Sequence, residues 1–488
     1  MEKINTLSTE CPQRDVRVLQ FGEGNFLRAF VDDMLDIANE KTDFNGSVVI
    51  VKPIAFGSLE TFHQQDCKYT VLLRGLEDGK PMEVIRKITA VSDAVDAYSE
   101  YPKYSSLAKL PTLRFVVSNT TEAGIVLDTN DRFELCPPNT YPGKLCKLLF
   151  ERAQAFQYAE DKGLIILPVE LIDDNGIVLK QCVTALAKHW QLGERFERWL
   201  DTACVFASTL VDRIVTGYPK DEIEALWQKL GYEDRLLVTG EPFALWVIEA
   251  DKDISKELPL ADCGLPVIFT DNQKPYKQRK VRILNGAHTS FVPAAFLCGH
   301  DDVLSAMGDP LIKRFMQETL YEEVIPTLTL PRAELLAFAQ AVTERFQNPT
   351  IKHALLSICL NSVSKWKARC LPSLLAYTEL NAALPPHLTF SLAALMALYQ
   401  GGEYNDGQWI GSRFGKPYTL RDDERVLWFF AQNSALPPKA LVRDFLAQVA
   451  FFGQDLNQIE GLCQSVTASL ESILSAGMRN ALIEAFGG

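Results

Sequence analysis

The stretch Val16-Arg-Val-Leu-Gln-Phe-Gly22-Glu-Gly24-Asn-Phe-Leu-Arg28 decides the fold class of this chain. Its first half is a short apolar run that ends at a glycine, which predicts a buried strand. Apolar residues then recur at helical spacing over positions 27–38, which predicts an amphipathic helix. A glycine turn between a strand and a helix is the setting that a dinucleotide-binding fingerprint requires. The stretch therefore predicts the start of a nucleotide-binding α/β domain.

Each glycine of the turn has an expected task. Gly22 permits the tight turn, and Gly24 lets the backbone approach a pyrophosphate at the start of the helix, where N–H donors and the helix dipole favour an anion. Leu27 occupies the place of the usual third glycine, and we expect Arg28 to add a charged contact to phosphate. A plain strand-to-helix turn remains the alternative. The residues expected to hold the cofactor here are Val18, Leu19, Gln20, Phe21, Gly22, Glu23, Gly24, Asn25, Phe26, Leu27, Arg28 and Ala29.

More strands of the same kind follow along the first half. Apolar runs at Val48–Val51, Leu113–Val117 and Leu164–Pro168 are separated by helical patterns, which predicts a mostly parallel sheet that is buried on both faces. An acidic residue that binds the ribose usually follows the second strand, but Lys52 and Pro53 stand there. The motif by itself therefore leaves the choice between NAD and NADP open.

The second half has a different pattern. Long amphipathic stretches dominate, at 335–341, 351–366, 388–399 and 441–452, and strand-like runs nearly vanish. Prolines cluster between Leu258 and Lys280, which indicates a connection between domains. We expect an α/β Rossmann-type domain over residues 1–270 and a mainly α-helical catalytic and substrate domain over residues 271–488.

Composition limits the function classes. The 488 residues are 47% hydrophobic and 23% charged, which is typical of a globular protein with more than one core. A net charge of -13 disfavours nucleic acid and anionic membranes as partners, so an anionic substrate would need a locally basic pocket. The 11 cysteines form no CxxC pair, and we expect a reducing, cytoplasmic compartment. The N-terminus lacks the pattern of a signal peptide, and 388–399 is too short to cross a bilayer.

The segment Lys280-Val-Arg-Ile-Leu-Asn285-Gly-Ala-His288 carries the candidate chemistry. In an α-helix, Asn285 and His288 lie within ~60° of each other and Lys280 falls within a ~140° arc. Reduction of a carbonyl places negative charge on its oxygen, which an ammonium can protonate and an amide N–H can stabilise. In the oxidative direction a neutral lysine removes the proton, which requires cationic neighbours or desolvation. A solvated basic helix face with one structural histidine is the alternative.

Two competing motifs are weaker. Tyr276 and Lys280 have the spacing of the tyrosine–lysine pair of short-chain dehydrogenases, but that pair belongs inside a single Rossmann domain. Cys298-Gly-His300-Asp301 hints at a metal site, yet it lacks further ligands at zinc spacing, and a surface loop is the better interpretation.

Several motifs together resemble the polyol-specific long-chain dehydrogenase/reductase family, which includes the mannitol dehydrogenases. The family's Lys-x4-Asn-x2-His pattern matches Lys280, Asn285 and His288. The family's loop after a Rossmann strand resembles Ser118-Asn-Thr-Thr-Glu-Ala-Gly124. Its Val-Asp-Arg-Ile segment resembles Leu210-Val-Asp-Arg-Ile214, and its Arg-Phe-x-Asn-Pro segment resembles Arg345-Phe-Gln-Asn-Pro349. The resemblance spans residues 16 to 375.

The resemblance implies an activity and a site. Within the family the chain is most similar to a uronate-specific branch, which implies NAD-linked interconversion of D-tagaturonate and D-altronate in hexuronate catabolism. It implies no catalytic metal, with Lys280 as acid/base and Asn175 and Asn285 at the developing oxyanion, and with Asp212 as a supporting group. The loop after the strand adds Asn119, Thr120 and Glu122 to the expected cofactor contacts. Reduction of fructuronate, oxidation of a mannitol-type polyol, and a non-catalytic dinucleotide-binding sensor are the alternatives.

One departure from the polyol members points to a sugar acid. Those enzymes tend to carry Asp-Gly-Ser-x-Lys after the Arg-Phe-x-Asn-Pro segment, whereas this chain has Asn361-Ser-Val-Ser-Lys365. Cationic side chains crowd this region, and a uronate carboxylate needs such cations while a neutral polyol does not. We expect some of them to bind the carboxylate, with a solvated helix face as the alternative for any single one. The candidates are Lys352, His353, Lys365 and Arg369.

Overall fold

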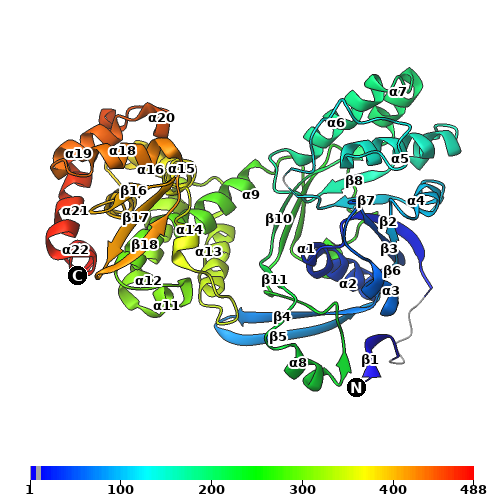
Figure 1. The fold of residues 1–488 in the computed structure, drawn as a ribbon, viewed down its shortest axis with the longest axis horizontal. Helices are drawn as coiled ribbons and strands as arrows, with labels where there is room; N and C mark the ends of the chain where they lie inside the picture. Colours follow the sequence, from blue (N-terminus) through cyan, green and yellow to red (C-terminus); the bar gives the residue numbers. More distant parts are fainter. Residues whose placement is uncertain (1, 7–12, 122, 488) are drawn as a thin grey trace. The chain divides into compact units, whose positions relative to one another are not determined.

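The structure is a computed structural model that describes residues 2–6, 13–121 and 123–487. It divides into two compact units, Met1–Gly75 with Pro81–Gln273 and Leu76–Lys80 with Lys274–Gly488. Figure 1 shows the first unit in blue to green, and the part of the second unit that begins at Lys274 in green to red. The boundary expected between residues 270 and 271 stays a prediction.

A six-stranded parallel sheet forms the centre of the first unit, in the order β6-β3-β2-β7-β8-β9. This is the strand order of a doubly wound dinucleotide-binding fold, in which the order reverses at β2. The parallel sheet expected from the four apolar runs is confirmed. The strands are β2 (Asp15–Phe21), β3 (Gly46–Lys52), β6 (Val91–Asp96), β7 (Phe115–Ser118), β8 (Ile165–Pro168) and β9 (Val205–Phe206).

Both faces of this sheet are buried. Val18 and Ile50 belong to one apolar core and their neighbours Leu19 and Val49 to the other, because successive side chains of a strand point to opposite faces. Helices cover each face in Figure 1. The second core is covered by α5 (Tyr141–Ala155), α6 (Asn175–His189) and α7 (Glu194–Thr202), and the first by α1 (Asn25–Leu27), the π-helical turn η2 (Arg28–Asp32) and α2 (Asp33–Lys41).

Other strands of the first unit were not expected from the sequence. One sheet has the order β11-β13-β4-β5 and another the order β10-β14-β15. Their strands are β4 (Tyr69–Glu77), β5 (Lys80–Ile88), β10 (Ser208–Asp212), β11 (Val215–Gly217), β13 (Val238–Gly240), β14 (Leu245–Glu249) and β15 (Val267–Thr270), and β1 (Glu2–Lys3) pairs with β12 (Tyr232–Glu233). The remaining helices are η1 (Ile4–Thr6), α3 (Glu60–Gln64), α4 (Tyr101–Leu107), η3 (Glu160–Lys162), α8 (Ile223–Leu230) and η4 (Ala261–Cys263).

The second unit is mainly helical, as expected. Its elements up to Arg369 are α9 (Lys274–Arg279), η5 (Lys280–Asn285), α10 (Gly286–Leu297), α11 (Val303–Gly308), α12 (Pro310–Glu318), η6 (Thr319–Val324), η7 (Ile325–Thr327), α13 (Arg332–Phe346), α14 (Leu355–Ile358) and α15 (Ser362–Arg369). They are followed by α16 (Leu371–Asn381), α17 (Pro386–Ala397), α18 (Glu424–Asn433), α19 (Pro438–Leu446), α20 (Val449–Phe452), η8 (Leu456–Gln458), α21 (Leu462–Ala476) and α22 (Met478–Phe486).

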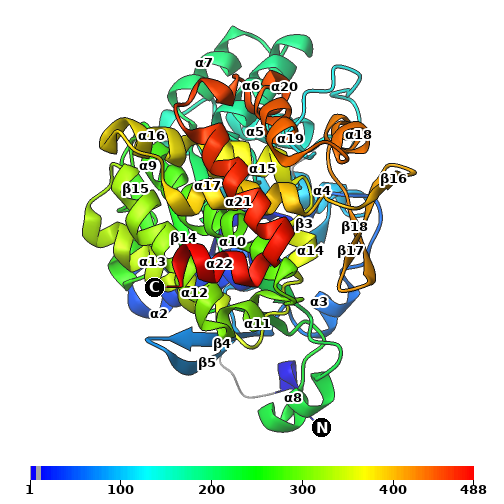
Figure 2. The ribbon, with the colours of Figure 1, turned by 90° about the vertical axis from the view of Figure 1, so that its left-hand side faces the viewer.

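Two apolar helices form the core of this unit. Residues 387–397 of α17 are all buried, and α10 is buried from Phe291 to Phe296. A helix that is apolar all round must be covered on all sides. The helix α17 packs against both α10 and α21, and Figure 2 shows α21 crossing in front of them.

Two expectations for the second unit were incomplete. The stretch 351–366 is not one helix, because it is split into α14 and α15 at Asn361, which adopts a left-handed backbone with φ of 53°. A three-stranded antiparallel sheet, β16 (Glu403–Asn405), β17 (Gln408–Arg413) and β18 (Lys416–Leu420), also interrupts the helices. These strands are short, and turn glycines at 407 and 415 separate them. Within the described ranges, no helix combines the length and the apolar character needed to cross a bilayer.

Candidate active site

The turn after β2 has the geometry that a dinucleotide needs. Gly22 has a φ of 122°, and a Cβ there would lie 3.1 Å from the carbonyl oxygen of Asn119, so only glycine fits. Its N–H donates to the Val51 carbonyl (3.0 Å), which ties the turn to β3. A Cβ on Gly24 would meet no atom within 4 Å. The backbone at Gly24 therefore lies open to the close approach of a pyrophosphate, as a dinucleotide site requires.

Arg28 lies differently from the expectation. Its side chain is buried, and its guanidinium donates to the carbonyl oxygen of Glu23 (3.2 Å), to Oδ1 of Asn25 (2.6 Å) and to the carbonyl oxygen of Leu236. Burial lowers the pKa of Arg28 from its ordinary value. These three contacts fix the side chain of Arg28 against the turn after β2, and its expected contact to phosphate stays a prediction.

The other residues expected around the turn divide into two groups. Val18, Leu19, Phe21 and Ala29 are fully buried in the two cores, so they support the turn from below. Gln20 is also buried, and its Nε2 donates to the Gly22 carbonyl (3.2 Å). Leu27 packs its Cδ1 toward Gly22, and Phe26 stacks on Phe30. Glu23, Gly24 and Asn25 keep solvent exposure and lie on the open side.

A buried carboxylate holds the loop that follows β7. Glu170 accepts hydrogen bonds from Ser118 Oγ (3.1 Å), from Thr120 N (2.9 Å) and from Thr120 Oγ1 (2.9 Å). Asn119 donates its backbone N–H to Phe21 (3.1 Å), and Glu122 lies outside the described residues. Burial raises the pKa of Glu170. Sequence reasoning missed Glu170, although a lone acid directly after the apolar run 164–169 was a signal for it.

Asn175, at the start of α6, has its carboxamide fully engaged by backbone. Its Nδ2 lies within hydrogen-bond distance of the carbonyls of Pro168 (3.0 Å), Glu170 (3.0 Å) and Thr209 (3.1 Å), and its Oδ1 accepts from Gly176 N (2.9 Å) and Thr209 N (2.8 Å). The side chain is completely buried. An amide with two hydrogens cannot serve these carbonyls and a substrate oxyanion as well. The geometry therefore favours a positioning role.

Asp212 ends β10 and is nearly buried. The neighbouring Arg213 forms an ion pair with Asp33 (3.1 Å) and donates to the Phe243 carbonyl (3.1 Å). A contact of Asp212 with substrate stays a prediction.

The segment from Lys280 to His288 is helical but not uniformly α-helical. Lys280–Asn285 forms the π-helical segment η5, and α10 begins at Gly286. A π-helix has about 4.4 residues per turn, so five residues turn ~50° past a full circle instead of the ~140° of an α-helix. Lys280, Asn285 and His288 therefore lie within an arc of about 60°. The α-helical estimate was wrong for Lys280, and π-helical turns are common at functional sites.

His288 lies in an aromatic and cationic environment. Its ring stacks on Phe346 with centroids 4.1 Å apart and meets the ring of His353 edge-on at 5.2 Å. Burial, together with the nearby charges of His353, Arg345, Arg369 and Lys365, lowers the pKa of His288 well below its ordinary value. Its Nε2 is buried without a hydrogen-bond partner in the part of the chain that the structure describes. The ring is therefore neutral and has one nitrogen available.

Two of the expected cations, Lys365 and Arg369, lie close to His288. Arg369 Nη1 donates to Thr289 Oγ1 (3.3 Å), and Lys365 Nζ donates to the Ile358 carbonyl (2.9 Å). Burial lowers the pKa of both groups, and the charge of Arg369 lowers that of Lys365 further. Lys365 and His288 also line a cavity of about 10 Å³, roughly the space of one water.

Of the two remaining carboxylate-binding candidates, His353 lies beside His288 and Lys352 does not contribute to its environment. Burial and the charge of Lys365 lower the pKa of His353. Lys352 is exposed, and the charges that lower the pKa of His288 come from other residues. Arg345, whose charge acts on His288, was recognised in the sequence only as part of a motif. We call His288, Arg345, His353, Lys365 and Arg369 the cation cluster.

The chain matches two family models that together span most of its length. Residues 16–262 match the mannitol dehydrogenase Rossmann domain, and residues 272–474 match the mannitol dehydrogenase C-terminal domain. It is 47% identical to an altronate oxidoreductase of Klebsiella pneumoniae (strain 342) and 47% identical to one of Escherichia coli O7:K1 (strain IAI39 / ExPEC), in each case over 99% of both chains.

Solved structures share the fold at lower identity. A D-sorbitol dehydrogenase in substrate-free form has a TM-score of 0.80 and 21% identity, covering 97% of this chain and 96% of that one. A ternary complex of Pseudomonas fluorescens mannitol 2-dehydrogenase with NAD and D-mannitol has a TM-score of 0.66 and 22% identity, covering 98% and 95%. These two similarities support the fold class.

Proposed function

This chain belongs to the mannitol dehydrogenase family, and we propose that it is an NAD-dependent oxidoreductase that interconverts D-tagaturonate and D-altronate by hydride transfer. The observation that carries the sugar-acid part of this proposal is the cation cluster in the second unit. A chain with a net charge of -13 gathers Arg345, Lys365 and Arg369 around one neutral histidine. Such a local positive field suits an anionic substrate.

The cluster offers the contacts that a carboxylate needs. A guanidinium recognises a carboxylate through paired N–H donors, and an ammonium adds a point charge. Arg369 and Lys365 are half-buried, which strengthens such contacts because less water competes with them. A neutral polyol would gain much less from these charges. We therefore assign Arg369 and Lys365 to the carboxylate, with His353 beside them. Lys352 and Asp212 remain weaker candidates, and Lys352 is the weakest because it is exposed.

The η5 segment supplies the groups for proton transfer. We assign Lys280 as the acid that protonates the carbonyl oxygen during reduction, and as the base, once deprotonated, during oxidation. The Asn285 amide stabilises the negative charge that develops on this oxygen. His288, held neutral, hydrogen-bonds a substrate hydroxyl or orients Lys280. NAD, when bound, supplies the hydride acceptor or donor. Gly22 and Gly24 hold its pyrophosphate, and Asn175 positions α6 instead of contacting the oxyanion.

Steady-state turnover with NADH separates this function from its rivals. We expect efficient oxidation of NADH with tagaturonate, slower oxidation with fructuronate, and little with fructose. Turnover of fructose at or above the rate for tagaturonate would overturn the sugar-acid assignment. Absence of turnover with every substrate, despite binding of NADH, would instead identify a non-catalytic dinucleotide-binding protein.

The cellular setting follows from the thiols and is part of the proposal. The ten cysteines that lie in the described residues are all free. Free thiols in this number are typical of a reducing compartment, and we therefore place the enzyme in the cytoplasm, with a small sugar acid as its partner and no role in nucleic-acid or membrane binding.

A further inference from the structure

Lys52 ends β3 at the position where doubly wound folds usually carry the acid that binds the ribose. Instead of pointing to solvent, its side chain is only 1% exposed. Its Nζ lies 3.0 Å from the Ile54 carbonyl oxygen, 3.2 Å from the Phe56 carbonyl oxygen and 3.0 Å from Oδ2 of Asp96. An ammonium has three hydrogens, so all of its donors are engaged.

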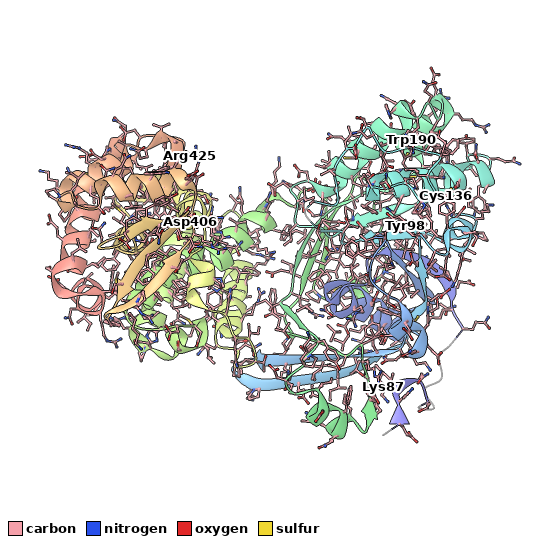
Figure 3. All side chains as sticks on the ribbon, in the orientation of Figure 1. Lys87, Tyr98, Cys136, Trp190, Asp406 and Arg425 are labelled. Atoms are coloured by element: carbon pink, nitrogen blue, oxygen red, sulfur yellow. The ribbon has the colours of Figure 1, made fainter. Side chains whose placement is uncertain are left out.

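Asp96 is held as firmly as its partner. It ends β6 and stands opposite Lys52 in the parallel register of the sheet. Its Oδ1 accepts a hydrogen bond from the backbone N–H of Tyr98 (2.9 Å), a residue labelled in Figure 3, while its Oδ2 faces Lys52. A buried ammonium is tolerated only when it is paired and hydrogen-bonded. The pair is therefore a fixed structural clamp across the carboxyl ends of β3 and β6.

The clamp sets the backbone of an exposed loop. Residues 54–58 are exposed, and two large apolar side chains stand out, Ile54 at 39% and Phe56 at 75% exposure. Lys52 binds the carbonyls of these same two residues. In this strand order a dinucleotide lies beyond the carboxyl ends of the strands, with its pyrophosphate at the turn after β2 and its adenosine on the side of β3.

We infer that Lys52 is a positioning residue for the adenosine half of the cofactor, and that its clamp with Asp96 replaces the usual acidic ribose ligand. The buried ammonium fixes the loop so that Ile54 and Phe56 present apolar surface to the adenine ring and the loop backbone faces the ribose. The inference rests on the proposed NAD dependence but is independent of the sugar acid.

Fragments of the cofactor test this placement. AMP contains the adenosine half and nicotinamide mononucleotide contains the other half, and ligand-observed NMR measures the affinity of each without any sugar acid. In Lys52→Met we expect AMP to bind about tenfold more weakly or worse, because the loop must be ordered on binding. The affinity for nicotinamide mononucleotide should stay within about twofold of wild type, since the variant leaves that half of the site intact. Lys52→Arg should restore AMP binding, because a guanidinium can donate to the same carbonyls.

Lys147 offers a matched control. Its nearly buried ammonium also donates to two loop carbonyls, those of Phe133 (2.8 Å) and Leu135 (2.9 Å), beside Cys136, which is labelled in Figure 3. Lys147→Met should cost similar stability and leave AMP binding unchanged. If Lys52→Met does not fold, Phe56→Ala decides, because an exposed side chain can be truncated without loss of the fold.

Two outcomes would overturn the inference. One is unchanged AMP affinity in a folded Lys52→Met protein or in Phe56→Ala. The other is an equal loss of AMP and nicotinamide mononucleotide binding, which would show a general effect on the fold. A failure to turn over uronates would leave the AMP measurement intact and would count only against the proposed substrate.

Discussion

Lys280 is the residue on which the proposed chemistry depends most. General acid–base groups typically contribute 10²–10⁴-fold to a rate, so we expect Lys280→Met to lower kcat for tagaturonate reduction by about this factor. The affinity for NADH should stay the same, because the glycine turn after β2, which is proposed to hold the pyrophosphate, lies in the first unit. Steady-state kinetics together with NADH fluorescence titration measures both quantities.

A lysine in the same unit serves as the control for this substitution. Lys416 is the exposed first residue of β18, and Lys416→Met makes the same lysine-to-methionine change there. It should keep wild-type kcat. A loss of less than about tenfold in Lys280→Met would contradict the acid/base assignment.

Arg369 distinguishes a sugar acid from a neutral sugar. Hydrogen bonds to charged groups are worth about 1.5–3 kcal/mol, so Arg369→Met should lower kcat/KM for tagaturonate by about 10- to 100-fold, mainly through KM. Arg369→Lys should recover only part of this loss, because an ammonium lacks the paired donors of a guanidinium. The residual turnover of fructose should not change.

The control for Arg369 is an exposed arginine of the same unit. The side chain of Arg443 is 65% exposed beside Asp444. We expect Arg443→Met to leave the turnover of both tagaturonate and fructose unchanged. Equal losses for tagaturonate and fructose in Arg369→Met would argue that Arg369 supports the fold and not the carboxylate.

At the scale of elements, the position of α6 depends on Asn175, the first residue of this helix. Asn175 joins the start of α6 to Pro168, at the end of β8, and to Thr209, in β10. Asn175→Ala removes these bonds and leaves buried carbonyls without donors, and each such group costs about 1–3 kcal/mol. We expect a loss of about 2–4 kcal/mol in the free energy of unfolding, measured by urea denaturation. Asn130→Ala, at an exposed asparagine, is the control and should change little.

This prediction also separates the two roles considered for Asn175. If Asn175 is a positioning residue, its substitution lowers the free energy of unfolding and affects kcat only because α6 is displaced. If Asn175→Ala kept the stability of the wild type and lowered kcat by more than about a hundredfold, a direct role at the oxyanion would be the better explanation.

The π-helical segment η5 and the broken stretch 351–366 show how elements build the site. An additional residue within the helical turn brings Lys280 to the side of Asn285 and His288. The break at Asn361 separates α14 from α15, which carries Lys365 and Arg369. Helical periodicity alone predicts neither feature, because both depart from a regular helix.

At the scale of the whole second unit, His387 joins three parts of the fold. It contacts Glu323 (2.7 Å) in η6 and Glu318 (3.0 Å) in α12, and it stacks on Phe486 at the end of α22. Burial works against the charged form, but the hydrogen bonds and charges of Glu323 and Glu318 raise the pKa of His387 above its ordinary value. The folded state therefore binds this proton more tightly than the unfolded chain does.

The sign of the pH dependence follows from this shift. Because the folded pKa is raised, the stabilisation by His387 is fully present below the unfolded value of about 6.5 and is lost as the pH rises through the folded value. Urea denaturation from pH about 5.5 to about 9 should show His387→Gln to be about 1–3 kcal/mol less stable than wild type at the acidic end, with the difference shrinking at alkaline pH. His189→Gln, at an exposed histidine, should follow wild type, and a difference that grows with pH would contradict the prediction.

The sequence by itself determined the parallel sheet, the glycine turn after its first strand and the mainly helical second half. These features depend on local hydrophobic period and on short motifs, which are visible in neighbouring residues. Only the tertiary structure decided where Arg28, Lys52 and Asn175 direct their polar atoms. Arg28 bonds to a carbonyl 208 residues further along the chain and Asn175 to one 34 residues away. A buried polar group must find whichever partner the fold brings beside it, and no local pattern specifies that partner.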